Sequence, residues 1–294
     1  MHVVTLLTRP DTPRLTTALA EGVRRAWGGD ALRWLEPEVA AEFAVAAVPD
    51  DRWDVWDALQ AQGIDMAVVP QAGRRKRLLL ADMDSTMIQQ ECIDELADMA
   101  GVGAFVSAIT ARAMNGELDF EAALRERVAL LKDLPVSIID RVIAERITFM
   151  PGGATLIATM KAQGGRAVLV SGGFVDFTAR VARVLGFDEN RANVLLAERG
   201  KLTGKVAEPI LGREAKVTAL EEVNRQMGIT AADVIAVGDG ANDLGMLGRA
   251  GMGVALHAKP AVSAQCELRV NHGDLTALLF LQGYAREDFV QARA

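Results

Sequence analysis

The sequence predicts an α/β protein in which a doubly wound parallel sheet carries a helical insert and follows a small α+β domain. Three observations support this fold class. The first 72 residues show a βαββαβ order of apolar patterns, which is typical of ferredoxin-like domains. From residue 73 onward, short apolar runs alternate with helical segments, as in parallel sheets buried on both faces. The chain of 294 residues, 50% of them hydrophobic, is long enough for about two such domains.

The N-terminal region, residues 1–72, supplies the ferredoxin-like order. The predicted elements are a strand at 3–8, a helix after Asp11-Thr12-Pro13, strands at 31–36 and 42–48, a helix at 51–61 and a strand at 64–69. We interpret the basic run 73–77 as a solvated linker to a second domain at 73–294, rather than as a nucleic-acid patch.

Uninterrupted apolar runs mark the strands of the second domain, because a half-exposed strand would alternate with polar residues. These runs lie at 78–81, 167–170, 234–237 and 253–256. Helices are predicted at 154–163 and 213–227, and a β-hairpin at 193–206. Residues of about 90–150 form a long amphipathic stretch with no strand pattern, so we expect a helical insert there.

Polar residues follow three of the four strands directly. Asp82 and Asp84 follow the first strand, Ser171 the second, and Asp239 and Asp243 the third. In open parallel sheets, ligands bind beyond the carboxyl ends of the strands. We therefore expect four carboxylates, a hydroxyl and several glycines at one edge of the sheet. So many like charges require a nearby cation.

This set of residue types points to phosphoryl transfer. Carboxylate oxygens without histidine or cysteine beside them favour Mg²⁺ over zinc. The glycines next to Ser171 expose backbone N–H groups to an anion, and Lys216 in the helix 213–227 can add a positive charge. Asp82, ionised at neutral pH, can accept a phosphoryl group, and Asp84 can act as a general acid–base.

Other classes of function fit the sequence less well. Gly238 and Gly240 follow a strand as in a dinucleotide motif, but Asp243 stands where that motif requires glycine or alanine. The chain has 32 Lys and Arg against 39 Asp and Glu, which argues against nucleic acid as a partner. Apolar runs fall short of the roughly 18 residues of a membrane helix, and we expect a cytoplasmic protein that does not bind membranes.

Taken together, these segments resemble the haloacid dehalogenase superfamily. The run from Asp82 to Thr86, DMDST, is similar to the nucleophile motif DxDx(T/V) of that superfamily. Ser171, Lys216 and the segment 238–243 stand in the order of its later motifs, and the insert resembles its type-1 helical cap. The segments DMDST, LRERV, SGGF and GDGAND narrow the resemblance to the phosphoserine phosphatases, over residues 77–285.

The resemblance implies roles for the matching residues of the core. Asp82 would be the nucleophile and Asp84 the general acid–base. Mg²⁺ would be held by the Asp82 carboxylate, the main-chain carbonyl of Asp84, and Asp239, with Asp243 in support. The remaining core residues would contact the phosphate or line its site: Ser171, Gly172, Lys216 and Asn242.

The resemblance also implies how the cap selects the substrate. Phosphoserine carries an ammonium and a carboxylate group, and it therefore needs one anionic and one bidentate cationic partner. Glu91 would meet the ammonium group and Arg127 the carboxylate. Met114 and Phe120 would close the pocket, and a closing cap would keep water from the first half-reaction.

The implied activity is Mg²⁺-dependent hydrolysis of O-phospho-L-serine to L-serine and phosphate through an aspartyl-phosphate, the last step of serine biosynthesis. Two alternatives remain open: a related phosphatase or phosphotransferase acting on phosphohomoserine or another small phosphomonoester, and a non-catalytic amino-acid sensor. The first domain resembles ACT-like regulatory domains. It is interpreted either as a ligand-binding module or as a packing module that forms a homodimer.

Overall fold

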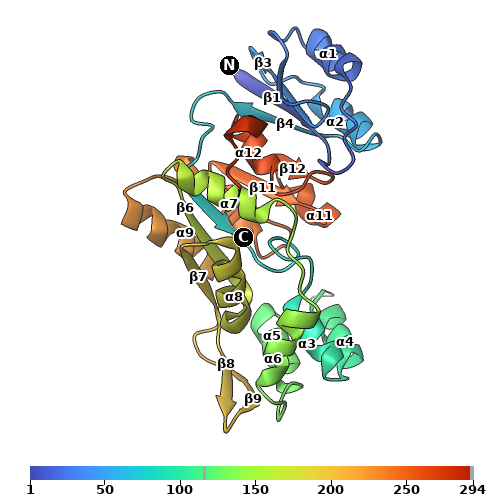
Figure 1. Cartoon of the computed structure of the whole chain (residues 1–294). Coiled ribbons are helices and arrows are strands. Elements are labelled where there is room, and N and C mark those ends of the chain that lie inside the picture. Colours follow the sequence, from blue (N-terminus) through green and yellow to red (C-terminus); the bar gives the residue numbers. More distant parts are fainter. Residues whose placement is uncertain (115–116, 292–294) are drawn as a thin grey trace.

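The computed structural model describes residues 1–114 and 117–291, in which the strands form two main sheets and one hairpin (Figure 1). A four-stranded antiparallel sheet comes first along the chain, and a six-stranded parallel sheet follows it. The predicted α/β class with a small α+β unit at the N-terminus is therefore confirmed.

The N-terminal sheet has the strand order β2-β3-β1-β4. Its elements are β1 (His2–Leu7), α1 (Thr17–Ala26), β2 (Arg33–Glu36), β3 (Ala40–Val45), α2 (Arg52–Gln60) and β4 (Asp65–Pro70). Successive side chains of a strand point to opposite faces, so Val4 packs in a cluster with residues of α1 and α2, whereas Val3 joins the core of the larger part. The βαββαβ order is confirmed, but α1 begins several residues later than expected, where the Thr16 side chain caps it.

The parallel sheet has the strand order β12-β11-β10-β5-β6-β7. Its strands are β5 (Leu78–Ala81), β6 (Arg166–Phe174), β7 (Glu189–Asn193), β10 (Val234–Gly238), β11 (Met252–Leu256) and β12 (Leu268–Val270). Both faces of its centre are buried: Leu79 of β5 belongs to one apolar cluster and Leu80 to the other. This burial explains why the predicted strands are uninterrupted apolar runs.

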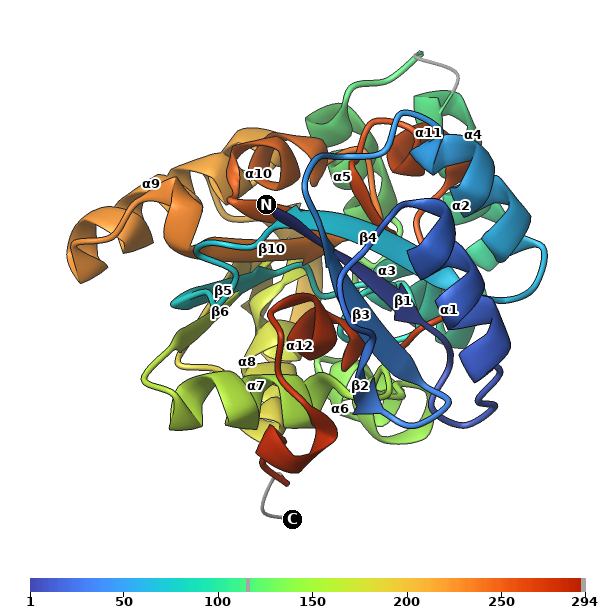
Figure 2. The same ribbon diagram turned by 90° about the horizontal axis from the view of Figure 1, so that it is seen from above.

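Helices cover both faces of this sheet (Figure 2). One cluster includes side chains of α7 (Gly153–Ala162), α8 (Val175–Leu185) and α12 (Ala277–Leu281). The opposite cluster includes side chains of α9 (Arg213–Met227) and α10 (Leu244–Arg249). The remaining short helices are α11 (Pro260–Ser263), η1 (Ala231–Asp233) and η2 (Arg286–Asp288).

A helical insert and a hairpin extend from one end of the sheet (Figure 1). The insert follows β5 and contains α3 (Cys92–Met99), α4 (Gly103–Met114), α5 (Phe120–Ala129) and α6 (Ser137–Glu145). The hairpin, β8 (Leu195–Glu198) and β9 (Lys201–Val206), follows β7. Leu202 of β9 exchanges backbone hydrogen bonds with Asp133 and Leu134, both at 2.9 Å, so hairpin and insert are joined. Both predicted elements exist, and they surround the carboxyl ends of the strands.

The basic run 73–77 is solvated only in part: Gly73, Arg75 and Arg77 are exposed, whereas Arg74 and Lys76 are half-buried. The interpretation as a solvated linker is therefore wrong for Arg74 and Lys76. Arg74 forms an ion pair with Glu42 of β3 at 2.8 Å, and its side chain is 11% exposed. Its Nε donates to the carbonyl of Leu281 in α12 at 3.2 Å, and Arg75 stacks 4.3 Å from the centre of the Tyr284 ring. The buried carboxylate of Glu42 and carbonyls of α12 thus bind Arg74, which fastens the N-terminal sheet to the larger part.

Two strands of the parallel sheet, β7 and β12, were not predicted from the sequence; both are edge strands. In the part of the chain that the structure describes, we find no helix with the length and apolar character to cross a membrane.

Candidate active site

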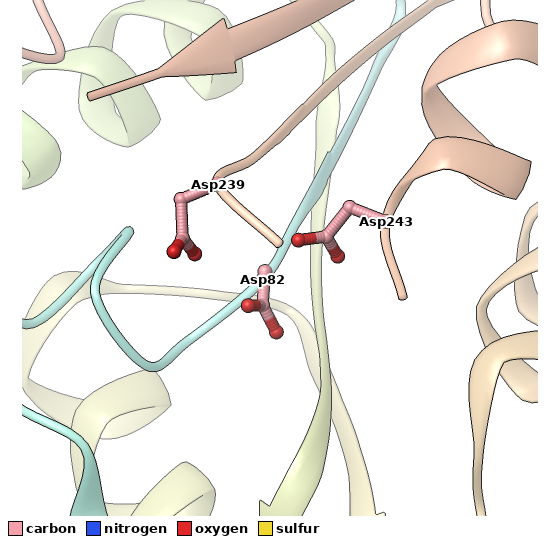
Figure 3. A group of neighbouring side chains, drawn as sticks. All are labelled: Asp82, Asp239 and Asp243. Carbon is pink, nitrogen blue, oxygen red and sulfur yellow. The ribbon is translucent and has the colours of Figure 1, made fainter. Parts of the chain in front are cut away.

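Three aspartates converge at the carboxyl ends of β5 and β10. Asp82 follows β5, and its backbone N–H donates to Val237 of β10 at 3.0 Å, which places it beside the end of the neighbouring strand. Asp239 follows β10 directly. One carboxylate oxygen of each of Asp82, Asp239 and Asp243 lies within 4.8 Å of the other two (Figure 3). We call these three residues the acidic cluster.

The turn after β10 directs Asp243 into this cluster. Asp243 immediately precedes α10, is fully buried, and accepts a hydrogen bond from the N–H of Gly240 at 2.9 Å. Gly238 must be a glycine, because a Cβ there would lie 2.3 Å from the Asp243 carboxyl carbon. The side chain of Asn242 lies over the same turn: a Cβ atom added to Gly240 would lie 2.3 Å from the Oδ1 atom of Asn242.

Lys216 joins the cluster from the first turn of α9. Its buried ammonium group forms ion pairs with Asp82 and, at 2.6 Å, with Asp243. Burial opposes its charge, but the two carboxylates raise the pKa of Lys216 above its ordinary value. Burial and the neighbouring Asp243 raise the pKa of Asp82. Burial and Asp243 likewise raise the pKa of Asp239 to about 6.

The acidic cluster fits a hard divalent cation. One ammonium group, that of Lys216, faces three carboxylates, so the possible negative charges of the cluster outnumber the positive charge beside it. A cation bound by carboxylate oxygens would compensate this excess, and oxygen ligands are those that Mg²⁺ prefers. Metal binding by this edge of the sheet is therefore consistent with the donor set.

Asp84 lies beside the cluster with a different environment. Its Oδ1 accepts the N–H of Cys92 at 3.0 Å, and its Oδ2 accepts the hydroxyl of Ser171 at 3.3 Å. Burial and the nearby Glu91 raise the pKa of Asp84 to about 6. A carboxyl group with this pKa can both donate and accept a proton near neutral pH.

Ser171 and Gly172 belong to β6, which continues past the predicted strand end to Phe174. The hydroxyl oxygen of Ser171 accepts the N–H of Gly173 at 2.8 Å. The ring of Phe120, the first residue of α5, rests on Gly172, since a Cβ there would lie 3.1 Å from the ring. The insert therefore contacts the predicted phosphate-binding segment directly.

The two charged residues expected to select the substrate lie near each other in the insert. Glu91 precedes α3, is exposed, and accepts the hydroxyl of Ser85 at 2.7 Å. Arg127 of α5 is half-buried, and burial lowers its pKa while the negative charges of Asp94 and Glu91 oppose this shift. The side chain of Met114, at the end of α4, lies outside the described residues.

Sequence reasoning missed three residues that contact this site. Thr86, fully buried, donates its hydroxyl to Asp239 at 3.2 Å. Asp94 lies near Arg127, and Asn193 hydrogen-bonds to Gly172. Only Thr86 was within a quoted motif. Asp94 and Asn193 carry no local pattern that distinguishes them from surface residues.

The chain is similar to several known proteins. Residues 79–248 match the family of haloacid dehalogenase-like hydrolases. A phosphoserine phosphatase of Streptomyces coelicolor is 41% identical over 97% of this chain and 71% of its own length. The solved structure of a HAD-family hydrolase from Salmonella enterica covers 96% of this chain and 98% of that chain, with 29% identity and a TM-score of 0.85.

Two further solved structures are of a phosphoserine phosphatase, one with substrate bound and one as an analogue of a phospho-aspartyl intermediate. Each is 41% identical to this chain and covers 70% of it and 98% of its own length, with a TM-score of 0.65.

Proposed function

This chain belongs to the phosphoserine phosphatases of the haloacid dehalogenase superfamily, and we propose that it hydrolyses O-phospho-L-serine to L-serine and phosphate as the last step of serine biosynthesis. The observation that supports the proposal most strongly is the buried acidic cluster with Lys216, next to a second carboxyl group whose pKa is about 6. Phosphoryl transfer through an aspartate uses a carboxylate nucleophile, positive charge beside the phosphate and a group that exchanges a proton, and these residues can supply all three.

In the first half-reaction, an oxygen of Asp82 attacks phosphorus and the bond between phosphorus and the serine oxygen breaks. Asp84 donates its proton to that departing oxygen, and L-serine leaves. In the second half-reaction, Asp84 takes a proton from water, whose oxygen attacks phosphorus. The bond to Asp82 breaks, and phosphate is released with both aspartates regenerated.

The phosphate would lie against the Ser171 hydroxyl, the N–H of Gly172 and the ammonium group of Lys216, with Asn242 beside them. Mg²⁺ would be held by Asp82, the main-chain carbonyl of Asp84 and Asp239, with Asp243 in support, and would supply positive charge beside the phosphate oxygens. Lys216, which binds two carboxylates of the cluster, can serve phosphate and carboxylate together.

Substrate selection is assigned to Glu91 and Arg127, with Phe120 and Met114 closing the pocket. The experiment compares kcat/KM for O-phospho-L-serine, phosphohomoserine and an aryl phosphate in the wild type, in Arg127→Ala and in Arg125→Ala. Arg125 is a matched control, because it lies on the same helix and pairs with Glu121 and Glu208 at the surface.

We expect Arg127→Ala to lower kcat/KM for phosphoserine about 10- to 100-fold, since it removes a charged hydrogen-bonding partner, while aryl phosphate turnover and the control change little. Equal turnover of phosphoserine by both variants would disprove the substrate assignment. If the wild type preferred phosphohomoserine, the substrate assignment would change to that compound.

The proposal extends to the whole chain: an ACT-like domain at 1–72, a phosphatase domain at 73–294 with its cap at about 90–150, and a cytoplasmic homodimer. One face of the N-terminal sheet packs with α1 and α2 in an apolar cluster of its own, which supports the division. Light scattering tests the proposed dimer. The expected mass is twice the chain mass of 31.5 kDa, and the mass of a single chain would contradict the proposal.

A further inference from the structure

Asn193, the last residue of β7, forms hydrogen bonds with two segments of the site: the end of β6 and the residues just before α9. It is 2% exposed. Its Nδ2 donates to the carbonyl of Gly172 at 2.8 Å and to that of Leu211 at 3.2 Å, and its Oδ1 accepts the N–H of Leu211 at 2.7 Å. These partners fix the orientation of the amide, because two carbonyls require its donors and one N–H requires its acceptor.

The hydrogen bond to the Gly172 carbonyl also orients the neighbouring N–H group of Gly173. The carbonyl of Gly172 and the N–H of Gly173 share one planar peptide unit, so fixing the first fixes the second. That N–H donates to the Ser171 hydroxyl oxygen at 2.8 Å, and the same hydroxyl donates to Asp84 at 3.3 Å. The amide of Asn193 thus sets the direction in which the Ser171 hydroxyl points.

The hydrogen bonds to Leu211 hold the entry to α9. Gly212 follows as the N-cap residue, and Lys216 lies in the first turn of the helix. The Phe120 ring rests on this segment as well as on Gly172: added Cβ atoms would lie 3.3 Å from the ring at Gly212 and 3.1 Å at Gly172. Asn193 therefore holds together the two glycines on which the insert packs.

We propose that Asn193 is a positioning residue for phosphate binding: it holds the end of β6 and the start of α9 in the relative placement that lets one anion contact both. The inference rests on the proposed phosphate contacts of Ser171, Gly172 and Lys216. Asn193 itself does not touch the substrate. Its loss would leave Gly172 and Leu211 with unpaired, partly buried backbone groups and free the peptide unit to rotate.

The test compares Asn193→Ala with Asn190→Ala. Asn190 lies on the same strand, and its Oδ1 accepts the hydroxyl of Thr178 in α8 at 2.9 Å, away from the phosphate contacts. We expect Asn193→Ala to raise both the KM for phosphoserine and the inhibition constant of orthophosphate about 10-fold or more, because the anion site is misaligned. Asn190→Ala should change both constants less than about twofold.

A merely structural role would give a different result. If Asn193→Ala only reduces the folded fraction, kcat falls in proportion to that fraction while both constants stay unchanged, and the inference is overturned. Should the alanine variant not fold, Asn193→Ser retains a hydroxyl group and leaves room for a water molecule, and the same two constants decide.

The experiment separates this inference from the proposed function. A wild type without phosphoserine turnover would refute the proposed function, and calorimetric binding of orthophosphate to the wild type and to Asn193→Ala would then still decide the role of Asn193. Turnover by the wild type together with unchanged constants in Asn193→Ala would refute only the inference.

Discussion

The buried hydroxyl of Thr86 extends the acidic cluster beyond its three carboxylates. Because it donates to Asp239 at 3.2 Å, it orients one of the proposed metal ligands. We expect Thr86→Val to raise the Mg²⁺ concentration for half-maximal activity about 10-fold, with most of kcat retained at saturating Mg²⁺. Thr178→Val is the control, since Thr178 is equally buried but bonds to Asn190. Equal Mg²⁺ requirements in both variants would remove Thr86 from the metal site.

Single residues also show where sequence reasoning succeeds. Asp82 and Asp239 follow apolar runs directly, and adjacent parallel strands bring such positions to one edge, so their meeting was predictable. Asn193 was not predictable as a site residue, because its partners at Gly172 and Leu211 are distant in sequence. Its contacts depend on β7 pairing with β6, which no local pattern indicates.

Among the elements of the parallel sheet, the central strands were predicted well and the two edge strands were missed. The sequence of β7, ENRAN, is polar and lacks β-branched residues, so pairing with β6 and not propensity makes it a strand. The short β12 is likewise held by its neighbour β11. The helical insert was predicted as one region, but the positions of its four helices and their contact with the hairpin depend on tertiary packing.

The return from the insert to the sheet depends on Gly152, which precedes α7. Gly152 has a φ of 82°, and a Cβ there would lie 2.7 Å from the backbone nitrogen of Thr276. Gly164, just after α7, has a φ of 81° with no atom within 4 Å of its Cβ position. An alanine would be strained at either position, but only at Gly152 would its Cβ also meet other atoms.

We therefore expect Gly164→Ala to lower the free energy of unfolding by about 1 kcal/mol from backbone strain alone. Gly152→Ala should cost about 2–4 kcal/mol, because the backbone at Thr276 must also move. Chemical denaturation measures both values. Equal losses in the two variants would show that the contact with Thr276 adds no strain.

At the scale of the whole molecule, a buried carboxylate of the N-terminal sheet binds the larger part of the protein. Asp65 of β4, fully buried, accepts the backbone N–H groups of Asn271, His272 and Gly273, at 2.8 to 2.9 Å, from the loop after β12. Charge-assisted hydrogen bonds of this kind are about twice as strong as neutral ones. The N-terminal unit is thus fastened to the larger part, in agreement with the buried contacts of Arg74.

We expect Asp65→Asn to lower the stability of the N-terminal unit by about 2–4 kcal/mol, since an amide donor would face backbone N–H groups. The four tryptophans, at 27, 34, 53 and 56, all report on this unit. In urea, the fluorescence transition of the variant should precede the circular dichroism transition. In the wild type and in the exposed control Asp57→Asn the two transitions should coincide. Coincident transitions in Asp65→Asn would contradict this.

The central claim, hydrolysis of phosphoserine through Asp82 in a metal-dependent site, is tested most directly by one assay. Phosphate release from O-phospho-L-serine is measured for the wild type and Asp82→Asn, each with Mg²⁺ and with EDTA. We predict release by the wild type with Mg²⁺, loss of release in EDTA with recovery on adding excess Mg²⁺, and no release by Asp82→Asn under either condition. Release by Asp82→Asn at the wild-type rate, or wild-type release that persists in EDTA, would contradict the account.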